Sequence, residues 1–287
     1  MSFGIALAGG GSRGAAHVGV LLALEENGLY PQSAAGTSAG SIIAGLYATG
    51  TTPKMLKEIV IEISQTGKYY LDADLTGIIK MIPQFIADHK INLTGLIKGN
   101  RFERFLYEQT DGKCIKEVNM RTIIPAVDIN SGYTIVYTNT LENVKPIKRV
   151  KWKTDILMSE AIRASCAVPA IFKPKFIDGM CLVDGGVTDV LPVDLLMAVG
   201  EHNILAVDIA QDYEMPENEN LIDISSHALT IMSTHLKECH SHGERLLLKP
   251  TLPEHAGLLT LDQMEQCMDA GYEATIKNIS VIKALFG

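Results

Sequence analysis

A pentapeptide with the pattern Gly-x-Ser-x-Gly, at residues 36–40, constrains the fold of this chain more than any other stretch. The small residues before it are typical of a strand end, and the apolar spacing after it predicts a helix. A serine on such a tight strand-to-helix turn exposes its hydroxyl, and Gly36 and Gly40 avoid the crowding that a Cβ would cause. The turn also places Ser38 at a helix N-terminus, where free N–H groups stabilise a developing oxyanion. The pattern favours a nucleophilic serine, with a simple turn capped by Ser38 as the alternative.

A second strand–loop–helix unit precedes this turn. An apolar strand is expected over residues 3–8 and a helix over 15–27, and the loop between them is rich in glycine. Its residues are Gly9, Gly10, Gly11, Ser12, Arg13 and Gly14. Three consecutive glycines let backbone N–H groups approach a substrate closely, as in an oxyanion hole. If the first two strands are parallel neighbours, this loop and Ser38 open at the same edge of the sheet. Arg13 is expected either to bond the loop carbonyls or to face the substrate.

The same loop matches the Gly-x-Gly-x-x-Gly pattern of dinucleotide sites through Gly9, Gly11 and Gly14. That function requires an acidic residue at the end of the second strand, to bind the ribose. The chain has Gly-Thr-Ser at 36–38 in this place, and it lacks a Walker-type lysine. Dinucleotide binding is therefore the less favoured alternative.

Composition excludes several classes of protein. The 287 residues are 47% hydrophobic and 20% charged, which is typical of a globular protein with a sizeable core. A formal charge of −8 argues against nucleic acid, or an anionic membrane surface, as the main partner. The chain has no apolar run of about 18 residues, and its start does not resemble a signal peptide. Five scattered cysteines argue against a disulfide framework or a zinc site and favour a cytoplasmic location. The sequence carries no signal for an oligomeric state.

Strands and helices alternate along the rest of the chain, which predicts an α/β fold whose mostly parallel sheet is covered on both faces. No linker or repeat is evident, so residues 1–287 are expected to form a single domain. Further strands are expected at 123–129, 133–137, 176–179, 180–183 and 203–209. Further helices are expected at 53–65, 98–109, 156–164, 192–199, 221–244 and 262–285.

The stretch 75–87 is strongly apolar, with Pro83 inside it and a stripe of polar residues at Lys80, Gln84 and Asp88. A kinked helix that covers the core is the favoured interpretation. The alternatives are a mobile cap or a surface that makes transient contact with a membrane.

A serine nucleophile needs a base, and in most serine hydrolases this base is a histidine. Four histidines follow the serine in a suitable order, namely His202, His235, His240 and His242. None lies on an obvious strand-end loop. His235 and Cys239 are four residues apart on a predicted helix, but solvated helix positions explain them better than a metal site. His17, beside the glycine loop, is expected to have a packing or hydrogen-bonding role.

Asp184 is the better candidate for the base. It ends an apolar strand, and Gly185 and Gly186 after it allow close approach to another part of the backbone. A carboxylate at the lip of such a strand is partly desolvated, which raises its pKa above about 3.9 and makes it a stronger base. It could then bond Ser38 directly as a two-residue dyad. A purely structural Asp-Gly-Gly turn is the alternative.

These pieces together resemble the patatin-like phospholipase family, in its compact bacterial form. The resemblance covers about residues 3–285 and rests on four ordered motifs. The matching segments are 9–14 with 16–21, 36–40, 164–169 with Phe172 and Pro174, and 184–186 with Pro192.

The resemblance implies a three-layer α/β/α fold and a serine acyl-ester hydrolase that acts on lipids or other acyl esters. Ser38 would attack the ester, Asp184 would be the base, and the glycine-loop amides, helped by Arg13, would hold the oxyanion. An acyl-enzyme would form and then be hydrolysed, without a metal or cofactor. The alternative is a catalytically weak regulatory or lipid-binding module on the same fold. A location in the cytoplasm, at times peripheral at a membrane, is expected.

Overall fold

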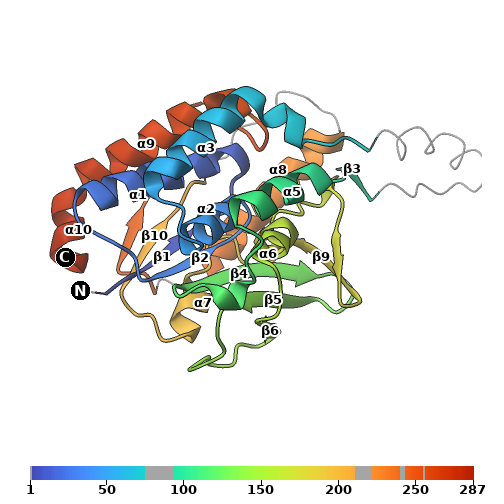
Figure 1. The fold of residues 1–287 in the computed structure, drawn as a ribbon, viewed down its shortest axis with the longest axis horizontal. Coiled ribbons are helices and arrows are strands. Elements are labelled where there is room, and N and C mark those ends of the chain that lie inside the picture. The colour runs from blue at the N-terminus through green and yellow to red at the C-terminus, as the bar shows by residue number, and fades with distance from the viewer. Residues whose placement is uncertain (1, 75–93, 211–220, 240–242, 255) are drawn as a thin grey trace, which may run out of the picture.

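The computed structural model describes residues 2–74, 94–210, 221–239, 243–254 and 256–287 (Figure 1). The strands are β1 (Gly4–Leu7), β2 (Ser33–Gly36), β3 (Gly95–Ile97), β4 (Arg121–Asp128), β5 (Tyr133–Thr138), β6 (Val150–Lys153), β7 (Ala170–Phe172), β8 (Lys175–Ile177), β9 (Met180–Asp184), β10 (Ile204–Val207) and β11 (Leu246–Leu248). The α-helices are α1 (Ala15–Glu26), α2 (Ala39–Ala48), α3 (Pro53–Thr66), α5 (Asn100–Gln109), α6 (Met158–Ser165), α7 (Val193–Ala198), α8 (Leu221–Cys239), α9 (Met264–Lys277) and α10 (Ile279–Phe286). Two short 3₁₀ helices matter for the site, η1 (Gly11–Gly14) and η4 (Gly185–Val187).

One nine-stranded sheet organises the described residues. Its strands run in the order β11-β10-β1-β2-β4-β5-β6, and β9 pairs with both β4 and β8. The strands from β11 to β4 are parallel, whereas β5 and β9 are antiparallel to β4. The expected α/β fold with a mostly parallel sheet is therefore confirmed, and so is the expectation that the first two strands are parallel neighbours.

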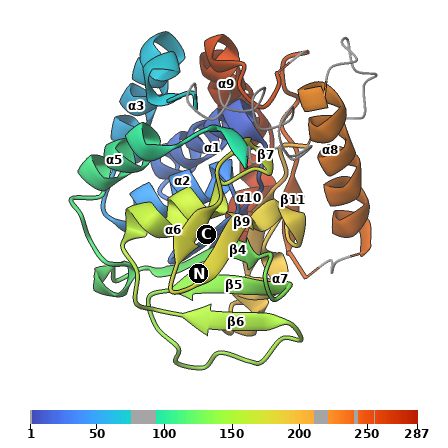
Figure 2. The ribbon, with the colours of Figure 1, turned by 90° about the vertical axis from the view of Figure 1, so that its right-hand side faces the viewer.

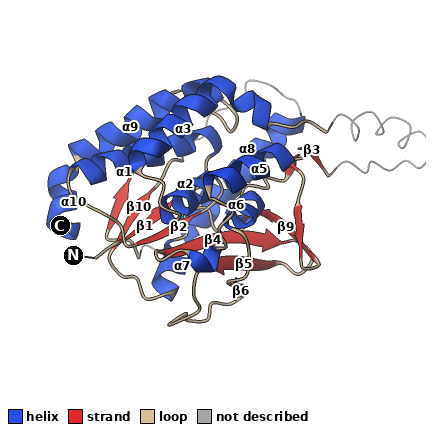
Figure 3. Ribbon diagram, in the orientation of Figure 1, coloured by secondary structure: helices blue, strands red, loops and turns tan. Residues whose placement is uncertain are grey.

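Helices cover the two faces of the sheet unequally (Figure 3). Alternate side chains of β1 point to opposite sides, as in any strand. Leu7 belongs to a large core cluster with side chains of α1, α3 and α9, while Ala6 belongs to another with Val193 and Leu196 of α7. A third cluster joins β4 and β5 to α5 and α6. The sheet is thus the middle of three layers, and α7 forms the thin one.

The pairing along β4 brings two strand ends together. Strand β5 occupies one edge of β4, so β2 and β9 share the other edge. The parallel pairing of β2 ends with Ala35 opposite Ile123, and the antiparallel pairing of β9 ends with Asp184 opposite Ala126. The two strands therefore point toward each other across three residues of β4, or about 10 Å. The turn that follows β2 and the residue Asp184 at the end of β9 therefore lie in the same gap between the two strand ends.

Several local expectations differ from the structure. The helix expected over 262–285 is divided into α9 and α10 at Asn278, whose side chain donates to the carbonyl oxygen of Ala274 at 2.8 Å. The short strands β6 and β11 and the pair β3–β7 had no clear alternation in the sequence. The stretch 75–87 lies outside the described residues. Among the described helices, none combines the length and the apolar character that crossing a bilayer requires.

Candidate active site

Ser38 lies on the sharp turn between β2 and α2, with φ 52° and ψ −121°. A positive φ is unusual for a residue with a Cβ and costs about 1–3 kcal/mol. The turn needs glycine on both sides. A Cβ on Gly36 would collide with the carbonyl oxygen of Gly40, and a Cβ on Gly40 would collide with that of Leu7. Small residues thus permit the turn, and the turn holds the Ser38 side chain in one orientation.

Three hydroxyl groups hold the backbone of this turn. The N–H of Ser38 donates to Oγ of Ser165 at 3.0 Å, and Oγ of Ser41 donates to the carbonyl of Ser38 at 2.6 Å. On the other side, Oγ1 of Thr37 donates to the carbonyl of Asp189 at 2.9 Å. The N–H of Ser38 is therefore not free to bind an oxyanion, because Ser165 already accepts it. Sequence reasoning missed this contact, although Ser165 belongs to one of the motifs quoted for the family resemblance.

The glycine loop is anchored at both of its ends. The N–H of Gly9 donates to the carbonyl of Val190 at 2.9 Å, and the N–H of Ser12 donates to the carbonyl of Leu258 at 3.0 Å. Val190 is next to Asp189, so one short segment holds both the glycine loop and the Ser38 turn. No sequence pattern indicated this role of residues 189 and 190.

The middle of the loop keeps its amides free. Within the described part of the chain, the N–H groups of Gly10 and Gly11 have no hydrogen-bond partner. Nε of Arg13 donates to the carbonyl of Gly10 at 3.0 Å, which fixes the orientation of this peptide. Gly11 has φ +62°, and a Cβ there would collide with the backbone of Leu258. Two adjacent amides are therefore available to a bound oxygen atom.

Asp184 is buried, with 5% of its surface exposed. Its Oδ1 accepts from the N–H of Gly186 at 2.7 Å, whereas Oδ2 has no partner of full hydrogen-bond geometry among the described residues. Burial raises the pKa of Asp184 from 3.8 to about 6, against the opposing effects of the Ser38 hydroxyl and the Gly186 N–H. The Ser38 hydroxyl is thus close enough to stabilise the carboxylate.

One cleft, with a volume of about 130 Å³, brings half of the sequence-predicted site residues together. Those that line it are Gly9, Gly10, Arg13, Ser38, Asp184 and Gly186. Gly11 and Ser12 line a neighbouring pocket instead. The remaining glycines have packing roles, since a Cβ on Gly14 would meet Ala39 and one on Gly185 would meet the backbone of Pro125.

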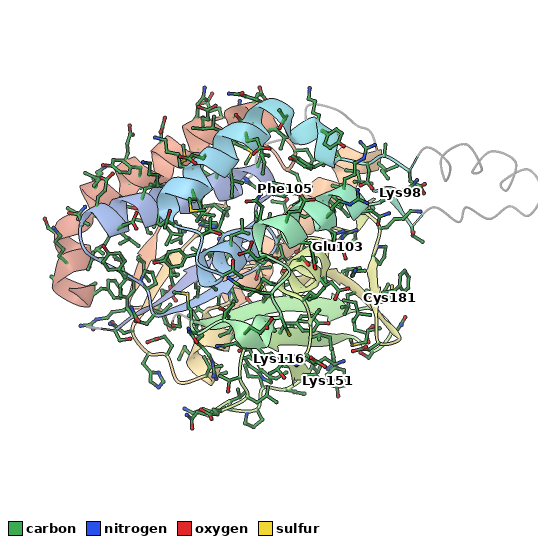
Figure 4. The ribbon with its side chains drawn as sticks, viewed as in Figure 1. Lys98, Glu103, Phe105, Lys116, Lys151 and Cys181 are labelled. Carbon is green, nitrogen blue, oxygen red and sulfur yellow. The ribbon has the colours of Figure 1, made fainter. Side chains whose placement is uncertain are left out.

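The neighbouring pocket is apolar and has a volume of about 150 Å³. It shares Ser38, Val168 and Leu258 with the cleft. Its walls include Phe102 and Phe105, both from α5, and the second of these is labelled in Figure 4. Ser38 thus lies where this pocket meets the cleft, whose lining includes charged side chains such as Arg13 and Asp184.

The histidines whose side chains the structure describes are His17, His202 and His235, and none of these three lines the cleft. His17 is fully buried beneath the glycine loop, where Nε2 lies 2.8 Å from the carbonyl oxygen of Ala8. Burial lowers the pKa of His17 to about 4, so that its ring is neutral at physiological pH. His202 and His235 are exposed, and His240 and His242 lie outside the described residues. The described residues also contain no group of three histidine, cysteine or acidic side chains arranged to hold a metal ion.

Cys166 is a further neighbour of the nucleophile turn that sequence reasoning left without a role. Its Sγ lies 3.7 Å from Oγ of Ser41, and it lines the apolar pocket. Burial raises the pKa of the Cys166 thiol to about 12. The thiol therefore stays protonated, and it does not compete with Ser38 as a nucleophile.

Proteins that are similar in sequence to this chain have names that refer to phospholipases. Lysophospholipase NTE1 of Mycosarcoma maydis is 28% identical over 209 residues, which are 73% of this chain and 10% of that protein. Patatin-like phospholipase domain-containing protein 6 of Homo sapiens is 26% identical over 210 residues, which are 73% of this chain and 13% of that protein. The chain thus spans only about a tenth of the length of these relatives.

Among solved structures, VipD from Legionella pneumophila superimposes with a TM-score of 0.51 at 13% identity, covering 98% of this chain and 67% of that one. This similarity concerns the fold alone. The sequence model of the family described as "Patatin-like phospholipase" matches residues 5–197, which include the glycine loop, the Ser38 turn and Asp184. The chain therefore belongs to the patatin-like phospholipase family.

Proposed function

We propose that this protein hydrolyses the acyl esters of lipids, with Ser38 as the nucleophile and Asp184 as the base. One observation carries the proposal. Ser38, on a strained turn, lines the same cleft as a buried carboxylate whose pKa is raised to about 6, and none of His17, His202 and His235 lines that cleft. Relatives that are named lysophospholipases support a lipid ester as the substrate.

In the first step, Oγ of Ser38 attacks the ester carbonyl carbon while its proton passes to Asp184. A carboxylate with a pKa near 6 is ionised at neutral pH and still basic enough to accept this proton. The tetrahedral intermediate then collapses, and Asp184 returns the proton to the departing alcohol. Water, activated by the same carboxylate, releases the fatty acid from the acyl-enzyme.

The oxyanion of the intermediate is assigned to the N–H groups of Gly10 and Gly11. These amides have no partner among the described residues, and they belong to the loop between the cleft and the apolar pocket. Loss of one such donor typically lowers the rate by about 10²–10³-fold. Arg13 contributes by donating a hydrogen bond to the Gly10 carbonyl oxygen, which fixes the orientation of this peptide.

The acyl chain is assigned to the apolar pocket. Phe102, Phe105 and Phe172 supply much of its wall, and Ile42 and Met264 line it as well. A chain that enters here places its ester carbonyl at Ser38, and the alcohol portion then lies in the cleft beside Arg13 and Asp184. Ile42→Trp is therefore expected to shift the preference toward shorter acyl chains.

We propose further that residues 1–287 act as one acyl hydrolase domain. The family match ends at residue 197, but β10 and β11 lie beyond it and pair in the same sheet as β1. The described cysteines 114, 166, 181 and 267 are free thiols, which suits a protein of the cytoplasm.

Labelling with a fluorophosphonate probe tests the assignment of the nucleophile. The wild-type protein should be labelled on a single serine, and Ser38→Ala should abolish the labelling. Ser64→Ala is a matched control, because this hydroxyl lies on α3 and is bonded to Glu265 outside the cleft. Lipidomic analysis of mixed phospholipid vesicles should then show free fatty acid as a product of the wild-type protein alone. A well-folded protein that neither reacts with the probe nor releases fatty acid would instead be a regulatory or lipid-binding module.

A further inference from the structure

Among the side chains of α8 that the structure describes, apolar ones are exposed and polar ones line the cleft. Surface helices normally bury an apolar stripe and expose a polar one. The half-buried side chains of α8 that line the cleft are polar, whereas Ile224 and Ile231 face the solvent. The polar residues are Thr230, Ser233, Thr234 and Lys237. The exposed fractions of the large apolar residues are 51% for Ile224, 39% for Ile231 and 57% for Met232.

The exposed apolar residues form a continuous stripe. Ile224, Ala228, Ile231 and Met232 are spaced by four, three and one residues, which places them on one side of a helix. Ala228 is exposed as well. Figure 2 shows α8 at the outer edge of the molecule, away from the sheet. Single exposed apolar residues are common, but an ordered stripe of them marks an interaction surface.

The stripe continues into the cleft of Ser38. Met232 belongs to the stripe and also lines the cleft. Helix α8 contacts η4, the turn that follows Asp184. Leu259, which is 41% exposed, lines the apolar pocket. A lipid that leaves a surface docked on this stripe would therefore reach Ser38 along apolar side chains.

We propose that this stripe of α8 docks the protein on a lipid surface whose net charge is close to zero. The inference rests on the proposed function, because a hydrolase of lipid esters takes its substrate from a lipid surface. Charge favours an uncharged surface, since the chain carries a formal charge of −8 and anionic lipids would repel it. The one described lysine of α8, Lys237, faces inward and pairs with Asp208 at 2.6 Å. Binding then depends on burial of apolar area rather than on ion pairing.

The test is vesicle flotation with phosphatidylcholine vesicles and the full-length chain, at low and high salt. The wild-type protein should float with the vesicles, and raising the salt from 0.1 to 1 M should leave the bound fraction unchanged or higher, because apolar binding is not screened. The double variant Ile224→Gln with Ile231→Gln should bind at least about tenfold more weakly, since two isoleucines no longer enter the interface. Glutamine is a good helix former, so α8 should persist.

Ile276→Gln with Val281→Gln is the matched control. These residues are 38% and 49% exposed, on α9 and α10, and α10 lies at the opposite end of the molecule from α8 in Figure 1. This variant should bind vesicles like the wild type. Hydrolysis of a water-soluble short-chain ester should be the same in both double variants, because neither alters a residue that lines the cleft or the apolar pocket.

Three results would overturn the inference. The first is wild-type vesicle binding by the α8 variant. The second is binding that requires anionic lipid and is lost in high salt. The third is a wild-type dimer that becomes monomeric in the α8 variant, which would assign the stripe to a second copy of the chain. A wild-type protein that fails to cleave the soluble ester would instead contradict the proposed function, and the flotation result would still stand by itself.

Discussion

The turn that carries Ser38 and the turn that carries Asp184 lie in the same cleft but are built in opposite ways. The Ser38 turn has a strained backbone, and hydroxyl groups of Thr37, Ser41 and Ser165 hold it through hydrogen bonds of 2.6–3.0 Å. The Asp184 turn bonds its own chain through Gly186 and leaves one buried carboxylate oxygen without a full partner. The Ser38 side chain is thus positioned by its backbone, whereas burial raises the pKa of the Asp184 carboxyl.

This difference shows how the proposed dyad would work without a third residue. In a triad, the acid orients the histidine, and the histidine takes the proton. In the proposed dyad the Ser38 turn would supply the orientation, and Asp184, whose pKa burial raises to about 6, would take the proton. The two turns should therefore respond differently to mutation.

The largest expected effect comes from removing the base. Asp184→Asn should lower kcat/KM for a short-chain ester by about 10⁴-fold or more, as loss of a member of a catalytic unit commonly does. His202→Ala and His235→Ala should retain activity, because these exposed side chains do not line the cleft. Steady-state assays of the three variants check this. An inactive histidine variant together with an active Asp184→Asn variant would show that Asp184 is not the base.

The same change should stabilise the fold. The pKa of Asp184 in the folded protein is about 6, above its ordinary value of 3.8. The stability that this carboxyl contributes is therefore complete below about pH 4 and is lost as the pH rises through 6. Two pKa units correspond to about 3 kcal/mol, so Asp184→Asn should raise the melting temperature by several degrees at pH 8 and hardly at pH 4. Calorimetry at the two pH values measures the difference, and equal shifts at both would refute it.

A smaller effect is expected for the support of the Ser38 turn. Ser165→Ala removes the acceptor of the Ser38 N–H and should lower kcat about tenfold, with KM changed less than about twofold. Thr49→Ala is the control, since its hydroxyl bonds the carbonyl of Leu46 at the far end of α2. Steady-state kinetics of both variants at one pH measure these changes in kcat and KM. Equal losses in both would show that the bond to Ser165 has no special role.

The smallest effect concerns backbone strain. Ser38→Gly should stabilise the fold by about 1–2 kcal/mol, because glycine adopts a positive φ without penalty. Ser38→Ala retains the Cβ and should therefore gain less. Both variants lose the hydroxyl that stabilises the Asp184 carboxylate, so the difference in stability between them should not depend on pH. Denaturant unfolding of the two variants measures this difference, and a difference that follows the ionisation of Asp184 would argue against strain as its source.

The elements that depend on local sequence patterns could be predicted from the sequence. The glycine spacing indicated both strand–loop–helix units, and the strands expected at 123–129 and 133–137 correspond to β4 and β5. The strands expected at 176–179 and 180–183 correspond to β8 and β9. The short strands β6 and β11 were missed because three or four residues are too few to show an alternation. The break at Asn278 was missed because the apolar period continues through it.

The site was harder to predict where contacts are distant in sequence. Ser38 and Asp184 stood out because glycines flank both of them. That β9 follows β2 along the same edge of β4 is a matter of topology, which no local pattern encodes. The bond from Ser38 to Ser165 spans 127 positions, and residues 189 and 190 hold the two turns through their backbone carbonyls. Backbone acceptors leave no signature in side-chain identity, so only the fold reveals them.

The central claim is that a buried carboxylate, not an imidazole, activates Ser38. The pH dependence of fluorophosphonate labelling tests it most directly, because the probe reports the nucleophile without any assumption about the lipid. In the wild-type protein the labelling rate should rise with a single midpoint near pH 6, the pKa of Asp184. In Asp184→Asn labelling should be slow at every pH. A midpoint near 7 that persists in Asp184→Asn and disappears in a histidine variant would contradict the account.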